Sequence, residues 1–398
     1  MELKSVLLDE RIEAANVLVE LSIREYLSVA PHIIDNNEYQ RKKVIKSKIK
    51  EILREDLLKG CSIPPIVLSI KTEGLGNTFD YKKFKDSSVI ENSFKEKSLL
   101  IIDGLQRTYV MLGLEEELRK EKKIEILEKF LNYKIRTEIY VGLNRLGILY
   151  RMITLNTGQI TMSTRHLMEI LYFDYQETGV ADIKFVKDKD EEVVRPNTNE
   201  FKFKEALDGF NSYLEKDENL IERTEILDNI RTLNSLSKEE YKKDLFKLFI
   251  VAYKKFLDII VSKADNWQYK KEDFENTEYA LKSPPFGKSP VEIFKRSQAF
   301  TGFGGALGQL KTNKSVTIEQ VHEMITNIIV SENDFPQCFK LILKYLDTIK
   351  EKSKKIGNDQ RYFFRFLFQN LFDPEADNKL NFDKAIEAAF NRTRADKL

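Results

Sequence analysis

The pattern of apolar and polar positions changes near residue 200. Before it, apolar runs typical of strands, such as IPPIVLSI at 63–70 and the alternating KIRTEIYV at 134–141, are interspersed with helical spacing. From Phe201 onward the spacing is helical almost throughout, as in LFKLFIVAYKKFLDIIV and RYFFRFLFQNLF. The pattern predicts an α+β protein with a mixed α/β domain over 1–180, a charged linker or surface excursion over 181–200 and a helical domain over 201–398.

The first half predicts further elements. Residues 7–28 have apolar positions at roughly helical spacing and predict a helix, and a second helix is predicted to end at Gly60, a favourable C-cap. The polar residues 71–97 predict a loop. Residues 146–153 predict a helix that stops at a loop of small polar residues, 156–159.

The stretch SLLIIDGLQRTYVMLGL at 98–114 carries the clearest chemical signal. Four apolar residues predict a buried strand that ends at Asp103 and Gly104, after which the apolar spacing becomes helical. The first turn of a helix offers unpaired backbone N–H groups and the positive end of the helix dipole, and both favour a bound anion. Since the guanidinium of Arg107 suits phosphate, we predict a phosphate or nucleotide site at this turn.

Composition restricts the classes of partner. The 65 basic and 64 acidic residues nearly cancel, so DNA binding would require a local basic patch. The lysines of QRKKVIKSKIK favour a solvated helix face, with a phosphate-tracking stripe as the alternative. Cys61 and Cys338 alone cannot form a disulfide framework or a cysteine zinc module, and no apolar run reaches the length of a membrane helix. We expect a cytoplasmic protein with no membrane partner.

Three signatures follow one another along the chain: EYQR at 38–41, IIDGLQRT at 101–108 and ITLNTGQITMS at 153–163. With the order of elements around them, they resemble the ParB and sulfiredoxin-like superfamily over about residues 30–175. The branch they resemble is the Asp-Gly-Gln-Gln-Arg proteins that form the amino-terminal half of GmrSD-type restriction systems, and more distantly the DGQHR proteins of the DndB type.

The resemblance implies a ParB-like fold and a protein that binds, and hydrolyses, a nucleoside triphosphate in DNA-linked host defence or DNA metabolism. It implies that Asp103 and Arg107 are catalytic, with Asp103 holding Mg²⁺ or orienting a water molecule. It also implies a set of residues that bind the nucleotide and its phosphates: Gln40, Arg41, Gly104, Gln106, Thr108, Asn156, Thr157 and Gln159.

Two departures from the family pattern limit the expected chemistry. Leu105 stands where the motif has its first Gln, which removes a hydrogen-bonding group and affects catalysis more than binding. The three histidines are scattered singly, so the carboxyl half cannot form a His-Asn-His nuclease. The alternative function is a non-catalytic regulator that senses a nucleotide or DNA and docks a partner through its helical domain. The expected macromolecular partners are another protein or further copies of the chain in a homo-oligomer.

Three other stretches could carry function. TGFGGALG at 301–308 lacks the third glycine of a dinucleotide fingerprint, and we expect close helix packing there. The aromatic residues of 362–368, interleaved with arginines, favour core packing over base stacking. The lone Trp267 lies among charged residues and is a candidate anchor for a partner.

Overall fold

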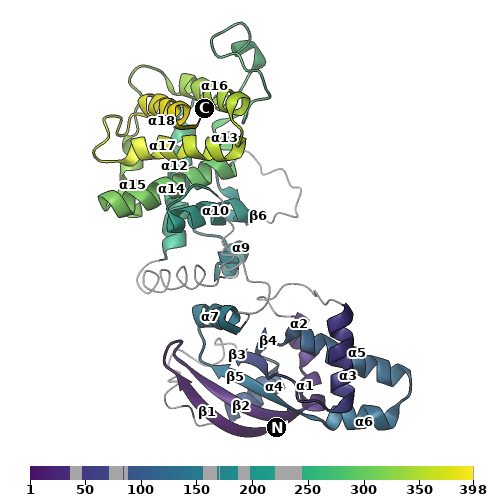
Figure 1. Ribbon diagram of the computed structural model, residues 1–398. Coiled ribbons are helices and arrows are strands. Elements are labelled where there is room, and N and C mark those ends of the chain that lie inside the picture. The colour runs from purple at the N-terminus through teal and green to yellow at the C-terminus, as the bar shows by residue number, and fades with distance from the viewer. Residues whose placement is uncertain are drawn as a thin grey trace. The chain divides into compact units, whose positions relative to one another are not determined.

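The structure is a computed structural model that describes residues 1–35, 47–70, Phe84, 88–155, 168–169, 171–186, 198–219 and 244–397. The described residues form two compact units, the first up to residue 155 and the second from residue 168 (Figure 1). Residues 168–180, which the sequence assigned to the first domain, belong to the second unit, where Tyr172 stacks on Phe246 with ring centroids 4.6 Å apart.

A five-stranded sheet organises the first unit. Its strands lie in the order β1 (Glu2–Asp9), β2 (Ala14–Ser22), β5 (Lys134–Val141), β3 (Ile66–Ile70) and β4 (Leu99–Asp103). All neighbouring pairs are antiparallel except β3 and β5, which are parallel. The predicted strands at 99–103 and 134–141 are confirmed, and the strand predicted at 63–70 is confirmed over residues 66–70.

The helix predicted over residues 7–28 is wrong, because most of this stretch forms β1 and β2. The apolar residues Ala15, Val19 and Ile23 recur every four positions, and an interval of four fits the two-residue period of a strand as well as a helical turn. The buried Val17 shows that the period is two. Only Ile23–Leu27 are helical, in α1.

Helices complete the first unit: α1, α2 (Ala30–Asp35), α3 (Ser47–Lys59), α4 (Ser88–Glu96), α5 (Leu105–Lys120), α6 (Ile124–Asn132) and α7 (Arg145–Leu155). One face of β2 and β5 packs with α1, α5 and α6 in a single apolar core. Gly60 ends α3 as predicted, with φ +77°. The predicted loop at 71–97 is wrong for its last part, which forms α4. The helix α6 was not predicted, because its apolar face is short and charged residues flank it in the sequence.

The second unit is mostly helical, as predicted. Its elements are α9 (Phe173–Thr178), the parallel pair β6 (Lys184–Val186) and β7 (Glu200–Lys202), α10 (Phe203–Glu215), α12 (Leu245–Lys263), the 3₁₀ helix Lys271–Asp273, α13 (Pro290–Phe294), α14 (Ser297–Lys314), α15 (Ile318–Met324), the 3₁₀ helix Ile325–Asn327, α16 (Phe335–Lys352), α17 (Ile356–Phe372) and α18 (Phe382–Lys397). The pair β6 and β7 lies partly in the predicted linker. None of the helices that the structure describes is long and apolar enough to cross a membrane.

The glycine-rich stretch 301–308 lies inside α14 and is buried. A Cβ on Gly304 would overlap the carbonyl oxygen of Gly209 in α10, and one on Gly302 would overlap Phe364 in α17. The stretch therefore lets two helices approach the backbone of α14, and the prediction of close helix packing is confirmed.

The aromatic residues of 362–368 also serve packing. Phe363, Phe364 and Phe368 are fully buried, which confirms core packing for these three. Trp267 stacks on the buried Phe339 with centroids 5.2 Å apart, so its ring is part of the packing of the second unit.

Candidate functional site

The turn between β4 and α5 has the predicted geometry. Asp103 ends the strand, and Gly104 is the N-cap of α5 with φ +102°. A Cβ at Gly104 would lie 2.8 Å from Cδ1 and 3.3 Å from Cα of Ile66. Both the positive φ and this close approach require glycine, so Gly104 shapes the turn.

The amino end of α5 has backbone N–H groups that the helix itself does not pair. Gly104 has no side chain to cap the helix, and the first turn contains no acidic residue. The first helical hydrogen bond runs from Thr108 N to Gly104 O at 2.9 Å, so the N–H groups of residues 105–107 have no partner within the helix. The side chain of Gln106 is exposed beside them.

Arg107 is held in place from two sides. Its Nη2 donates to Asp103 Oδ2 at 2.6 Å and to the carbonyl oxygen of Pro65 at 3.1 Å. The side chains of Arg107 and Asp103 are 17% and 23% exposed. Another donor of the guanidinium, Nε, is buried and has no hydrogen-bond partner among the described residues. The arginine is therefore fixed at the turn with part of its donor capacity unused.

In the structure these two residues pair with each other. The resemblance implied that Asp103 holds Mg²⁺ or orients a water molecule and that Arg107 binds phosphate; here the carboxylate and the guanidinium neutralise each other. The described residues contain no group of three or more His, Cys, Asp or Glu side chains placed to hold a metal ion. A role of Asp103 toward Mg²⁺ stays a prediction.

Thr108 does not face the solvent, which corrects its predicted role at the phosphates. Its side chain is fully buried, and Oγ1 donates to Gly104 O at 2.9 Å. The same oxygen lies 2.7 Å from the hydroxyl of Tyr26, from which it accepts a hydrogen bond. Burial raises the pKa of Tyr26 well above its ordinary value, so this hydroxyl stays protonated. Thr108 thus fastens the turn to α1.

Sequence reasoning missed Tyr26, because it lies 82 residues before Thr108 and no local pattern connects the two. The other predicted nucleotide-binding residues lie outside the described residues: Gln40, Arg41, Asn156, Thr157 and Gln159. The structure brings together Asp103, Gly104, Gln106 and Arg107 at one turn.

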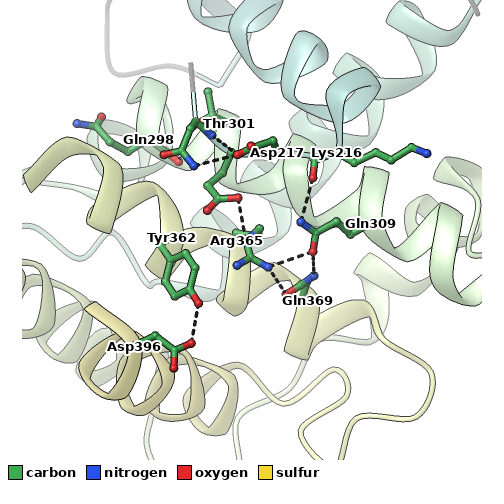
Figure 2. Close-up of polar contacts among 11 residues, drawn as sticks. Lys216, Asp217, Gln298, Thr301, Gln309, Tyr362, Arg365, Gln369 and Asp396 are labelled. Carbon is green, nitrogen blue, oxygen red and sulfur yellow. Dashed lines mark hydrogen bonds and ion pairs between the residues drawn. The ribbon is translucent and has the colours of Figure 1, made fainter. Parts of the chain in front are cut away.

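A second polar cluster lies in the second unit, around Arg365 of α17. Its Nη1 donates to Oε1 of Gln309 at 3.0 Å and of Gln369 at 3.1 Å (Figure 2). Its Nε lies 2.9 Å from Oε2 of the buried Glu218, an ion pair too bent to count as a hydrogen bond. The guanidinium also covers the rings of Tyr362 and Phe366, 4.7 and 4.2 Å from their centroids.

The rings of this cluster are already covered by side chains of the chain itself. The ring of Tyr362 has Arg365 and Lys397 over it, and its hydroxyl donates to Asp396 at 2.7 Å (Figure 2). A base stacking on Tyr362 would have to displace cations of the chain itself. We therefore assign Arg365 to the packing of α10, α14 and α17, and the candidate site is the turn at Gly104.

Comparison with family models, curated proteins and solved structures finds no match for this chain. The functional proposal therefore depends on the geometry of the turn between β4 and α5 and on the three sequence signatures.

Proposed function

We propose that this protein binds a nucleoside triphosphate through its phosphates at the amino end of α5. The observation that carries the proposal is the amino end of α5, which no described side chain caps and beside which the guanidinium of Arg107 is held. An anion there would receive backbone N–H donors and part of a guanidinium that Asp103 and Pro65 already hold in place.

Asp103 acts in this proposal as a competing anion. A phosphate that engages Arg107 has to share or replace the carboxylate, which lowers the affinity of the site. Replacing Asp103 with Asn keeps the shape and removes the charge. Asp103→Asn should therefore bind phosphate as tightly as the wild type or more tightly, whereas a metal-ligand role for Asp103 predicts weaker binding.

Binding is measured by isothermal titration with ATP, GTP, CTP and UTP, each with and without Mg²⁺. Arg107→Ala should weaken binding by about 10-fold or more, because a hydrogen bond to a charged group is worth about 1.5–3 kcal/mol. The matched control is Arg119→Ala, because Arg119 also forms a 2.6 Å ion pair, with Glu115, on the same helix but far from the turn. Equal affinity of Arg107→Ala and the wild type would contradict the proposal.

Hydrolysis is the reaction that the resemblance implies, and the same proteins test it. Phosphate release that is lost in Asp103→Asn would support an enzyme acting in DNA-linked defence or DNA metabolism. Binding without release would support the alternative, a nucleotide sensor that docks a partner through its helical unit. The pairing of Asp103 with Arg107 favours binding, since the guanidinium already engages the carboxylate.

A further inference from the structure

The strand β1 ends the sheet of the first unit. It pairs with β2 on one side, and no described strand pairs with its other side. An edge strand presents a row of backbone N–H and C=O groups that can pair with another strand. In β1 this row runs beside two exposed apolar side chains, Leu7 and Leu8, which are 69% and 48% exposed.

The two leucines lie on opposite faces of the sheet. Leu7 is opposite Asn16, whose side chain hydrogen-bonds Tyr140 OH at 2.8 Å on the face away from the main core. Leu8 is opposite Ala15, which belongs to the core that the helices cover. A partner strand could therefore cover both leucines only by extending the sheet itself.

The usual protection of an edge strand is confined to one end of β1. The pairing of β1 with β2 shifts between Leu3 and Ser5, which leaves Lys4 as an extra residue in a bulge. A bulge and an edge lysine both discourage pairing. From Ser5 to Asp9 the register is regular, and this part contains the exposed leucines.

We propose that a second copy of this chain pairs antiparallel with β1 about a two-fold axis through Leu7, joining two five-stranded sheets edge to edge. The axis is normal to the sheet, so residues that meet across it lie on the same face. Leu7 then meets Leu7 of the other copy, Leu8 meets Val6, and Asp9 meets Ser5.

Neighbouring registers match the side chains less well. An axis through Val6 would place Leu7 opposite Ser5 and Leu8 opposite Lys4, and an axis through Leu8 would place Leu7 opposite Asp9. The register centred on Leu7 gives both exposed leucines an apolar partner.

The charged side chains near this register already have partners within their own chain. Lys4 pairs with Glu2 and Glu20, and Asp9 pairs with Arg151. The register is therefore set by the apolar side chains of β1 and not by its charges.

Sedimentation velocity over a range of concentrations tests the proposal with the full chain. The wild type should form a dimer that dissociates on dilution, and Leu7→Lys should be monomeric at every concentration. Ile124→Lys is the matched control, because Ile124 is also 69% exposed but lies in α6. A wild type that stays monomeric, or a dimer that Leu7→Lys leaves intact, would overturn the proposal.

Cross-linking gives a second readout that does not depend on a charge at the interface. In a Cys61→Ser background, which removes the exposed native cysteine, Leu7→Cys should form an intermolecular disulfide on mild oxidation. Residues that face each other across antiparallel strands have Cα atoms about 4.5–5.5 Å apart, within the range of a disulfide. Leu3→Cys, on the same strand but beyond the bulge, should not cross-link. Equal cross-linking of the two variants would contradict the register.

Discussion

Arg107 Nη2 lies 2.6 Å from Asp103 Oδ2, and the two side chains close the turn through which β4 passes into α5. The same Nη2 reaches the carbonyl oxygen of Pro65 at 3.1 Å, just before β3 begins. One guanidinium thus ties the turn to the neighbouring strand, so we expect it to contribute to stability as well as to binding.

Arg107→Ala should lower the free energy of unfolding by about 1–3 kcal/mol, because it leaves a partly buried carboxylate and a carbonyl oxygen without their donor. Arg119→Ala should change it by less than about 0.5 kcal/mol, since Arg119 is 57% exposed. Urea unfolding followed by circular dichroism measures both. A similar small effect of the two substitutions would show that the pair at the turn does not stabilise the fold.

Gly104→Ala should destabilise the first unit by about 1–3 kcal/mol, because φ is +102° and the new Cβ would lie 2.8 Å from Ile66 Cδ1. Gly113 in the same helix is the control. A Cβ there would meet no atom within 4 Å, so Gly113→Ala should stabilise by about 0.5–1 kcal/mol. The midpoint of thermal unfolding should fall for Gly104→Ala and rise for Gly113→Ala. Midpoints that shift in the same direction would contradict this account.

Gly304→Ala should destabilise the second unit by about 3 kcal/mol or more, because its Cβ would overlap the backbone of α10. Gly357→Ala in α17 should be tolerated, since its nearest neighbour is the flexible side chain of Arg361 at 3.2 Å. The chain has one tryptophan, Trp267, and it lies in the second unit. Its fluorescence reports the unfolding midpoint of that unit for both variants.

Asp383 should make stability depend on pH. Burial opposes ionisation of its carboxylate, but N–H donors from Glu332, Ser331 and Asn333 outweigh burial and lower the pKa of Asp383. Because the folded pKa is lowered, the stabilisation is complete above the unfolded pKa of about 3.9 and is lost as pH falls through the folded value.

Asp383→Asn should therefore cost about 1–3 kcal/mol at neutral pH, and the difference from the wild type should shrink below a pH of about 4. The exposed Asp377 provides the control, and Asp377→Asn should change little at either pH. Urea midpoints from Trp267 fluorescence at both pH values measure the effect. If the stability difference between Asp383→Asn and the wild type stays constant with pH, the charge of Asp383 does not stabilise the fold.

Local patterns predicted the parts of the fold that depend on local sequence. The strand of residues 99–103, the turn at Gly104 and the helix after it follow from one change of apolar period. Gly60 marked the end of α3, because a glycine after a run of helical spacing is a common C-cap signal. The strands β1 and β2 could not be recognised in this way, because apolar residues four positions apart fit both a strand and a helix.

The sequence indicated which residues gather at the turn but not how they pair. The spacing of Asp103 and Arg107 is the four residues that let side chains meet, yet both were assigned to a ligand. The contact of Tyr26 with Thr108 could not be predicted, because a buried hydrogen bond between residues distant in sequence produces no periodic pattern. Local sequence thus indicates which groups gather at a turn, while tertiary packing decides which of them remain available.

The position of β5 has a consequence for the order in which the first unit folds. This strand is the last of the five in sequence, but it lies between β2 and β3 and pairs with both. Until it is in place, β1 with β2 and β3 with β4 are two separate strand pairs, and isolated pairs of strands are at most marginally stable. A chain emerging from the ribosome therefore cannot complete this sheet, or hold the turn at Gly104 against it, before residues 134–141 have been synthesised.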